Sequence, residues 1–160
     1  MMDKDLADKL LKFLRGYLIF YKEFLQLESE KYSDLTSNNI SSMDERVKTE
    51  EAFMLKSRGL ELERDRLVAL TGSPNATFRQ LLPMFIPSLQ PEAKEIFDEL
   101  SRVMLDLKEM NMRCNHLTEL KLHRVKIDLN KLKNNPELQT IYNAKIHEGT
   151  MPPCVLSKKV

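Results

Sequence analysis

Apolar side chains recur at helical spacing through the first part of the chain. Between about residues 3 and 35, the steps from one apolar position to the next alternate between four and three, which is the pattern of a heptad seam. The seam consists of Leu6, Leu10, Phe13, Tyr17, Phe20, Phe24 and Leu27. Further leucines beside it widen the apolar stripe, and a stripe this wide favours a helical bundle over a two-stranded coiled coil. We therefore expect a long first helix with one broad buried face.

A second helical stretch follows a polar reversal. Residues 33–42 are rich in Ser, Thr and Asn, and Asn38-Asn39 is the expected centre of the turn. Ser42, followed three residues later by Glu45, fits a capping box that would start the second helix. Gly72 suits the end of that helix. The apolar stripe of this stretch is weaker than that of the first helix.

The prolines mark a broken segment between two long helical stretches. None occurs before Pro74, four fall between residues 74 and 91, and the next is Pro136. Proline is excluded from helix interiors because it lacks the amide hydrogen and clashes with the preceding turn. Within the broken segment, a capping box at Thr77 predicts a short helix. The apolar residues of 78–86 form a plug that we expect to cover one end of the bundle.

The third helical stretch is the longest. It begins at Pro91, which suits the first turn of a helix, and continues to about Lys133. Its seam repeats the alternation of the first helix, through Ile96, Leu100, Val103, Leu107, Met110, Cys114 and Leu117. The whole pattern predicts an all-α fold, an up-and-down antiparallel bundle of three long helices with the short plug between the second and third. Residues 1–135 would form this bundle, and residues 136–160 a flexible, poorly ordered C-terminal tail.

The apolar stripe changes direction after Leu117. A continued seam would fall on Lys121, Arg124, Asp128 and Lys131. The apolar residues lie one position further on, at Leu122, Val125, Leu129 and Leu132, with Ile127 nearby. A shift of one residue turns the stripe by about 100°. At about 1.5 Å per residue the third helix would span about 65 Å and the others about 50 Å, so one end should overhang and need the tail or a partner to cover it.

The sign of the charge also changes along the third helix. Residues 91–112 carry 3 basic and 6 acidic side chains, whereas residues 113–133 carry 6 basic and 2 acidic ones. Compensation of the helix dipole explains this, and so does a basic, apolar-striped helix that receives an amphipathic partner helix. In the second interpretation, the contact residues are Leu122, Val125, Ile127, Leu129 and Leu132, with Lys121, Arg124 and Lys126 at the rim.

Composition and motifs argue against several classes of protein. The 25 basic and 24 acidic residues give a net charge of +1, which does not suit a nucleic-acid-coating protein. The longest apolar run, residues 17–21, is far shorter than a membrane span, and no secretory signal is visible at the start. With only two cysteines and no disulfide framework, we expect a cytosolic protein without stable membrane insertion.

Signatures of catalysis and of metal binding are missing from the sequence. It contains no phosphate-binding glycine loop, no G-x-S-x-G and no C-x-x-C. On a helix, Cys114 and His116 point to different faces, and His116 with His123 would supply only two ligands. We therefore expect no enzyme, no cofactor and no metal, and we place Cys114 in the buried seam.

Several segments, taken in order, resemble one known family. They are Leu62-Glu63-Arg64-Asp65-Arg66-Leu67, the Thr-Phe-x-x-Leu-Leu-Pro segment that begins at Thr77, the stretch 107–117 with Asn111 and Asn115, and the tail segments 140–145 and 156–160. Together they are similar to the FlgN family of flagellar export chaperones. The resemblance implies a non-catalytic cytosolic chaperone without ATPase activity.

The same resemblance implies partners and sites. Such chaperones bind C-terminal helical segments of the hook–filament junction (hook-associated) proteins, keep them from assembling prematurely and deliver them to the flagellar type III export gate. The cargo contact would lie at the end of the last long helix and in the tail, and Tyr142 would be the residue that docks at the export-gate subunit. Two alternatives stay open: a scaffolding coiled-coil adaptor that self-associates through the first or second helix, and a ligand- or metal-binding bundle enzyme.

Overall fold

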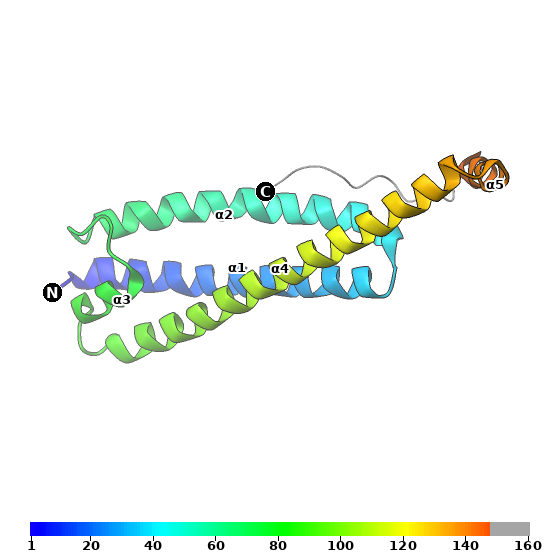
Figure 1. The fold of residues 1–160 in the computed structure, drawn as a ribbon. Helices are drawn as coiled ribbons and strands as arrows, with labels where there is room; N and C mark the ends of the chain where they lie inside the picture. The colour runs from blue at the N-terminus through cyan, green and yellow to red at the C-terminus, as the bar shows by residue number, and fades with distance from the viewer. Residues whose placement is uncertain (148–160) are drawn as a thin grey trace.

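The chain folds into helices, as the hydrophobic pattern predicts (Figure 1). The computed structural model describes residues 1–147, except for the side chains of residues 138, 139, 142 and 145–147. Three long α-helices dominate this part of the chain, and no strand occurs in it. They are α1 (Lys4–Thr36), α2 (Met43–Ala69) and α4 (Gln90–Lys133). The short elements are η1 (Ile40–Ser42), α3 (Phe78–Leu81), η2 (Leu82–Met84) and α5 (Pro136–His147).

The helix α1 supplies more of the core than any other helix. It packs extensively against α4 and less extensively against α2. Four members of its predicted seam are buried, namely Leu10, Tyr17, Phe20 and Leu27, and Phe13 and Phe24 are half-buried. The seam meets that of α4 at Ile96, Leu100 and Val103. Ion pairs from Arg15 to Glu92 and from Lys22 to Glu99 also join these two helices.

The helix α2 is held more loosely. Only Met43 near its start and Val68 near its end are buried. Between them, Phe53 stacks on Phe20 and Phe24 of α1, with ring centroids 5.4 and 5.5 Å apart. The weak apolar stripe that the sequence shows for this helix thus leads to a helix that buries few side chains completely and is held to α1 by aromatic, half-buried apolar and polar contacts.

The turns follow their residue types, with one exception. Asn38 has a φ of 56° and Gly72 one of 81°, and both lie where the sequence predicts a helix to end. The capping box at Thr77 is present. The one predicted at Ser42 is wrong, because its hydroxyl donates instead to the Asp34 carboxylate at 3.0 Å and makes no cap hydrogen bond.

The plug between α2 and α4 covers the end of the bundle at which α1 begins (Figure 1). Leu81 and Phe85 are buried in the main core, and Phe78 stacks on Phe97 of α4 with ring centroids 5.4 Å apart. The amide of Met2 donates to the main-chain oxygen of Met84 at 2.7 Å, which ties the start of the chain to the plug.

The start of the predicted tail differs from expectation. We predicted a poorly ordered segment from residue 136, but the structure places residues 136–147 in the 12-residue helix α5. Pro136 ends α4 because it cannot continue a helix, yet it suits the first position of a new one. The remainder of the predicted tail, residues 148–160, lies outside the described residues.

None of the helices in the described part of the chain has a stretch that is both long and apolar enough to cross a membrane.

Candidate helix-binding surface

The C-terminal part of α4 extends past the other two long helices (Figure 1). α4 has 44 residues, compared with 33 in α1 and 27 in α2. Its last buried residue is Cys114, which packs with Leu35, Met43 and the half-buried Leu117 at the α1–α2 turn. We call residues 118–133 of α4 the overhang. The predicted overhang is therefore present, and it is the C-terminal end of the helix that forms it.

Four predicted contact residues share one side of the overhang. Leu122, Leu129 and Leu132 are half-buried, and Val125 is 52% exposed. Their spacing of three, four and three residues keeps them within one face of a helix. This face forms an apolar stripe outside the bundle core.

Ile127 does not join that stripe. It is 41% exposed and lies two residues after Val125, or about 200° further round the helix. On that opposite side it is close in angle to Leu120, seven residues earlier, which is 52% exposed. The overhang thus has a four-residue apolar stripe and a smaller apolar pair on the other side.

The predicted rim cations fall into two kinds. The ammonium group of Lys121 donates to the side-chain oxygen of Asn38 in the α1–η1 turn. Arg124 and Lys126 are exposed, and neither forms an ion pair with any side chain in the described part of the chain. Their charge is therefore open to an acidic partner.

Tyr142 lies in α5, which follows the overhang and contacts α4. Figure 1 shows α5 at the far tip of α4, away from the plug. The side chain of Tyr142 is outside the described part of the structure.

The structure shows Cys114 in the seam, as the sequence predicts. Its side chain is fully buried, and its thiol donates to the main-chain oxygen of Glu28 at 3.5 Å. Burial raises the pKa of this thiol to about 11. Within residues 1–147, no three His, Cys, Asp or Glu side chains gather where they could hold a metal ion.

A buried charge cluster beside Cys114 was not predicted. Glu28 is fully buried and Lys31 is 8% exposed. The ammonium group of Lys31 lies 3.1 Å from one Glu28 carboxylate oxygen and 2.9 Å from one of Glu50 on α2. Burial raises the pKa of Glu28 to about 7. Burial lowers the pKa of Lys31, but its contacts with Glu50 and Glu28 outweigh this effect, and the pKa of Lys31 is raised. The sequence did hold a signal, because a seam continued four residues past Leu27 falls on Lys31.

These features define a class of protein: an all-α bundle in which one amphipathic helix extends beyond its partners. Comparison with protein families identifies it more closely. The family model described as FlgN protein matches residues 1–148, and the chain belongs to that family. The family is one of flagellar export chaperones, not of enzymes, and its members bind flagellar hook-associated proteins. No match was found among curated proteins or among solved structures.

Proposed function

We propose that this protein binds the C-terminal helical segments of hook-associated proteins through the overhang of α4, in the cytoplasm, and delivers them to the flagellar export gate. The observation that carries the proposal is the stripe of Leu122, Val125, Leu129 and Leu132, which lies beyond the bundle core. An amphipathic cargo helix would bury this stripe as it buries its own apolar face.

The charges of the overhang suit the same partner. Arg124 and Lys126 flank the stripe and face solvent. They would pair with acidic residues at the edge of the cargo helix, which speeds association and fixes its register more than it adds affinity. A short stripe with an exposed rim gives a modest interface, and a modest interface suits a chaperone that must release its cargo.

Delivery would use the neighbouring helix α5. Tyr142 lies nine residues after Lys133, the last residue of the overhang. One end of the molecule would therefore carry both the cargo contact and the export-gate contact. Replacing Tyr142 with Ala should reduce binding to the purified export-gate subunit and leave cargo affinity unchanged. Equal loss of both would show that Tyr142 belongs to the cargo contact instead.

The test of cargo binding is calorimetric titration of the full chain with C-terminal segments of the hook-associated proteins. We expect saturable one-to-one binding. The double variant Val125→Asp with Leu129→Asp should weaken it by at least about 30-fold, since each change places a charge against the apolar face of the cargo. Circular dichroism would confirm that the variant is still helical.

The chain offers a matched control for this variant. Leu55 and Leu62 lie seven residues apart on α2, and each is 69% exposed. The double variant Leu55→Asp with Leu62→Asp introduces the same two carboxylates on another helix, and should leave cargo affinity unchanged. Equal loss in both double variants would move the site away from the overhang, and no binding to any segment by the folded protein would contradict the proposed function.

Those exposed leucines also favour a second candidate, a self-associating scaffold. Two leucines at the same heptad position on α2 could pair with a second copy of the chain. Sedimentation velocity distinguishes the two functions. A stable oligomer that the Leu55→Asp with Leu62→Asp variant dissociates, together with no binding of hook-associated segments, would support the scaffold.

A further inference from the structure

A groove runs between α2 and α4, with α1 beneath it. The two outer helices pack against α1 and have little direct contact with each other. The space between them holds two hollows of about 790 and 510 Å³, which share Met104 and Lys108 and therefore form one continuous groove. The groove lies within the bundle, on residues that the overhang does not include.

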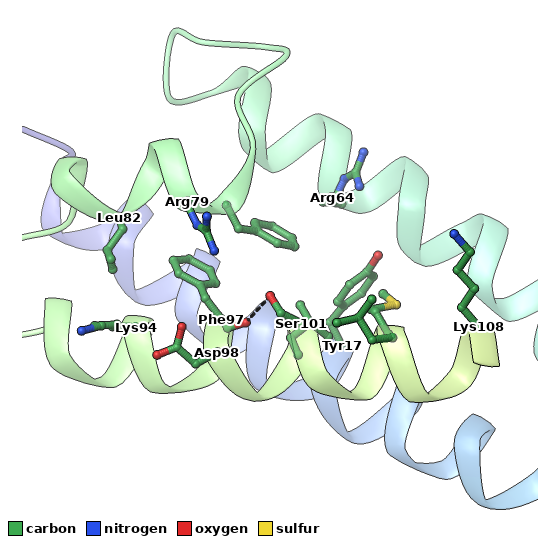
Figure 2. A pocket seen from close by; sticks show the side chains of 13 residues that line it. Tyr17, Arg64, Arg79, Leu82, Lys94, Phe97, Asp98, Ser101 and Lys108 are labelled. Atoms are coloured by element: carbon green, nitrogen blue, oxygen red, sulfur yellow. Dashed lines mark hydrogen bonds between the residues drawn. The ribbon is translucent and has the colours of Figure 1, made fainter. Parts of the chain in front are cut away.

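The floor of the groove is apolar. In the larger hollow, it consists of Tyr17 from α1, Phe78 from the plug, and Phe97, Leu100 and Met104 from α4. Figure 2 labels Tyr17 and Phe97 among them. The smaller hollow continues it with Phe24, Met54 and Leu107. Met54, Met104 and Met112 line the groove, and methionines suit a surface that adapts to the shape of a partner. Leu105 and Met112, which also line the groove, are 66% and 62% exposed.

The rim of the groove is basic. Arg79, Lys94 and Lys108 surround the larger hollow, with Arg64 on the α2 side (Figure 2), and Arg58 lies at the smaller one. Only Asp98 and Glu50 oppose them among the lining residues. Glu50 already pairs with Lys31, whereas Arg58, Arg79, Lys94 and Lys108 make no ion pair within residues 1–147. The groove therefore combines an apolar floor with uncompensated positive charge.

The length of the groove indicates what fits it. Its lining on α4 runs from Lys94 to Asn115, about 32 Å at 1.5 Å per residue. A helix of about 20 residues has that length. We propose that this groove is a second docking site, and that its occupant is an acidic amphipathic helix of a partner protein, with its apolar face on the floor and its carboxylates against the basic rim.

The positive charge of the rim argues against two other occupants of the groove, a second copy of this chain and the chain's own C-terminal segment. In a two-fold dimer the same surface meets itself, so the basic rim of one copy would face the basic rim of the other. The part of this chain that follows α5, residues 148–160, contains two lysines and one glutamate, and so does not complement a basic rim. An acidic helix from another protein satisfies both the floor and the rim.

The test uses a designed 20-residue helical peptide with a leucine stripe flanked by glutamates, titrated into the full chain. The same peptide with its leucines scrambled serves as the control ligand. Methionine methyl NMR locates binding, because Met54 and Met104 line the groove, whereas Met43 is buried at the start of α2. No methionine lies in the overhang, so binding there would not shift these signals directly.

We expect the Met54 and Met104 signals to shift with the striped peptide, and the Met43 signal to stay in place. The variant Arg58→Glu with Lys108→Glu should weaken binding by about tenfold or more, because both side chains are exposed at the rim. The matched control, Arg66→Glu with Arg102→Glu, changes two exposed cations of the same helices outside the groove and should keep the affinity.

Three results would overturn the proposal. The first is no shift at Met54 or Met104 at saturating peptide. The second is equal weakening by both charge variants, or equal binding of the scrambled peptide, which would indicate charge attraction without a site. The third is a dimer in sedimentation that the Arg58→Glu with Lys108→Glu variant dissociates, which would make the groove an interface between copies.

Discussion

Lys121 of α4 and Asn38 of the α1–η1 turn are joined by a hydrogen bond between their side chains. Among the described residues, it is the most C-terminal hydrogen bond between α4 and the rest of the bundle. Asn38 is also where the backbone turns with a φ of 56°, two residues after α1 ends at Thr36. The bond therefore marks the boundary at which α4 leaves the bundle.

Amide hydrogen exchange should change across this boundary. Residues 93–117 of α4 lie on the core, whereas the overhang beyond Lys121 makes few contacts outside its own helix and α5. Helices with few buried contacts open more easily. We expect the amides of residues 122–133 to exchange at least about tenfold faster than those of residues 96–114. Saturating hook-associated segments should slow the overhang selectively, and uniform protection along α4 would contradict this division.

The buried carboxyl of Glu28 should make stability depend on pH. Its pKa is raised to about 7, from 4.5 for an ordinary glutamate, so the folded state binds more protons than the unfolded state between these values. The free energy of unfolding should therefore fall as the pH rises from 4.5 to 7, and the contribution of this group is fully present below 4.5. The change is on the order of 2–3 kcal/mol. Urea unfolding at pH 5 and pH 8 measures it.

The variant Glu28→Gln isolates this effect. It replaces an ionisable group with a neutral one of similar shape, and should remove this part of the pH dependence and be more stable than the native chain at pH 8. Glu23→Gln, at an exposed position on the same helix, is the control and should keep the native slope. If Glu28→Gln kept the same slope as the native chain, Glu28 would not be the group responsible.

The thiol of Cys114 should be inert while the protein is folded. It is fully buried, hydrogen-bonded to the Glu28 main chain, and its pKa is raised to about 11, so almost no reactive thiolate forms at neutral pH. In a Cys154→Ser background, a thiol reagent should modify Cys114 at least about 100-fold more slowly in buffer than in 6 M urea. Rapid modification in buffer would show that α1 and α4 separate easily at this point.

The periodic parts of the fold were predictable from sequence because they depend on one physical quantity, the burial of apolar area. Two apolar seams each predicted a long helix, and the two helices meet in the core. The seams run from Leu6 to Leu27 and from Ile96 to Leu117. Gly72 and the Thr77 capping box set boundaries through local chemistry, which is also visible in the sequence. The wrong prediction of a cap at Ser42 shows the limit of local chemistry, because the Ser42 hydroxyl donates to Asp34 in a tertiary contact.

Features that depend on how the helices sit together were not predictable. The groove exists because α2 contacts α1 but hardly reaches α4, and no periodicity within one helix reveals the distance between two others. The cluster of Glu28, Lys31 and Glu50 likewise needs two helices to assemble. For the overhang, the sequence predicted the apolar stripe. The same prediction grouped Ile127 with Val125, although helical geometry sets these two residues on opposite sides.

The two sides of the overhang should therefore respond differently to mutation. Under the proposed function, the stripe that includes Val125 contacts the cargo helix, and the side that carries Ile127 and Leu120 does not. Both Val125 and Ile127 are half-exposed, at 52% and 41%, so a single change to Asp at either position should leave the bundle folded. Val125→Asp should weaken cargo binding by about tenfold or more, because the carboxylate would have to be buried against the apolar face of the cargo. Ile127→Asp should change affinity by less than about threefold.

Calorimetry on the two single variants, at one salt concentration and after a check of helicity, shows which side of the overhang contacts the cargo. The reverse order would place the cargo on the Ile127 side, and equal losses would mean that the cargo wraps the overhang instead of lying along one stripe.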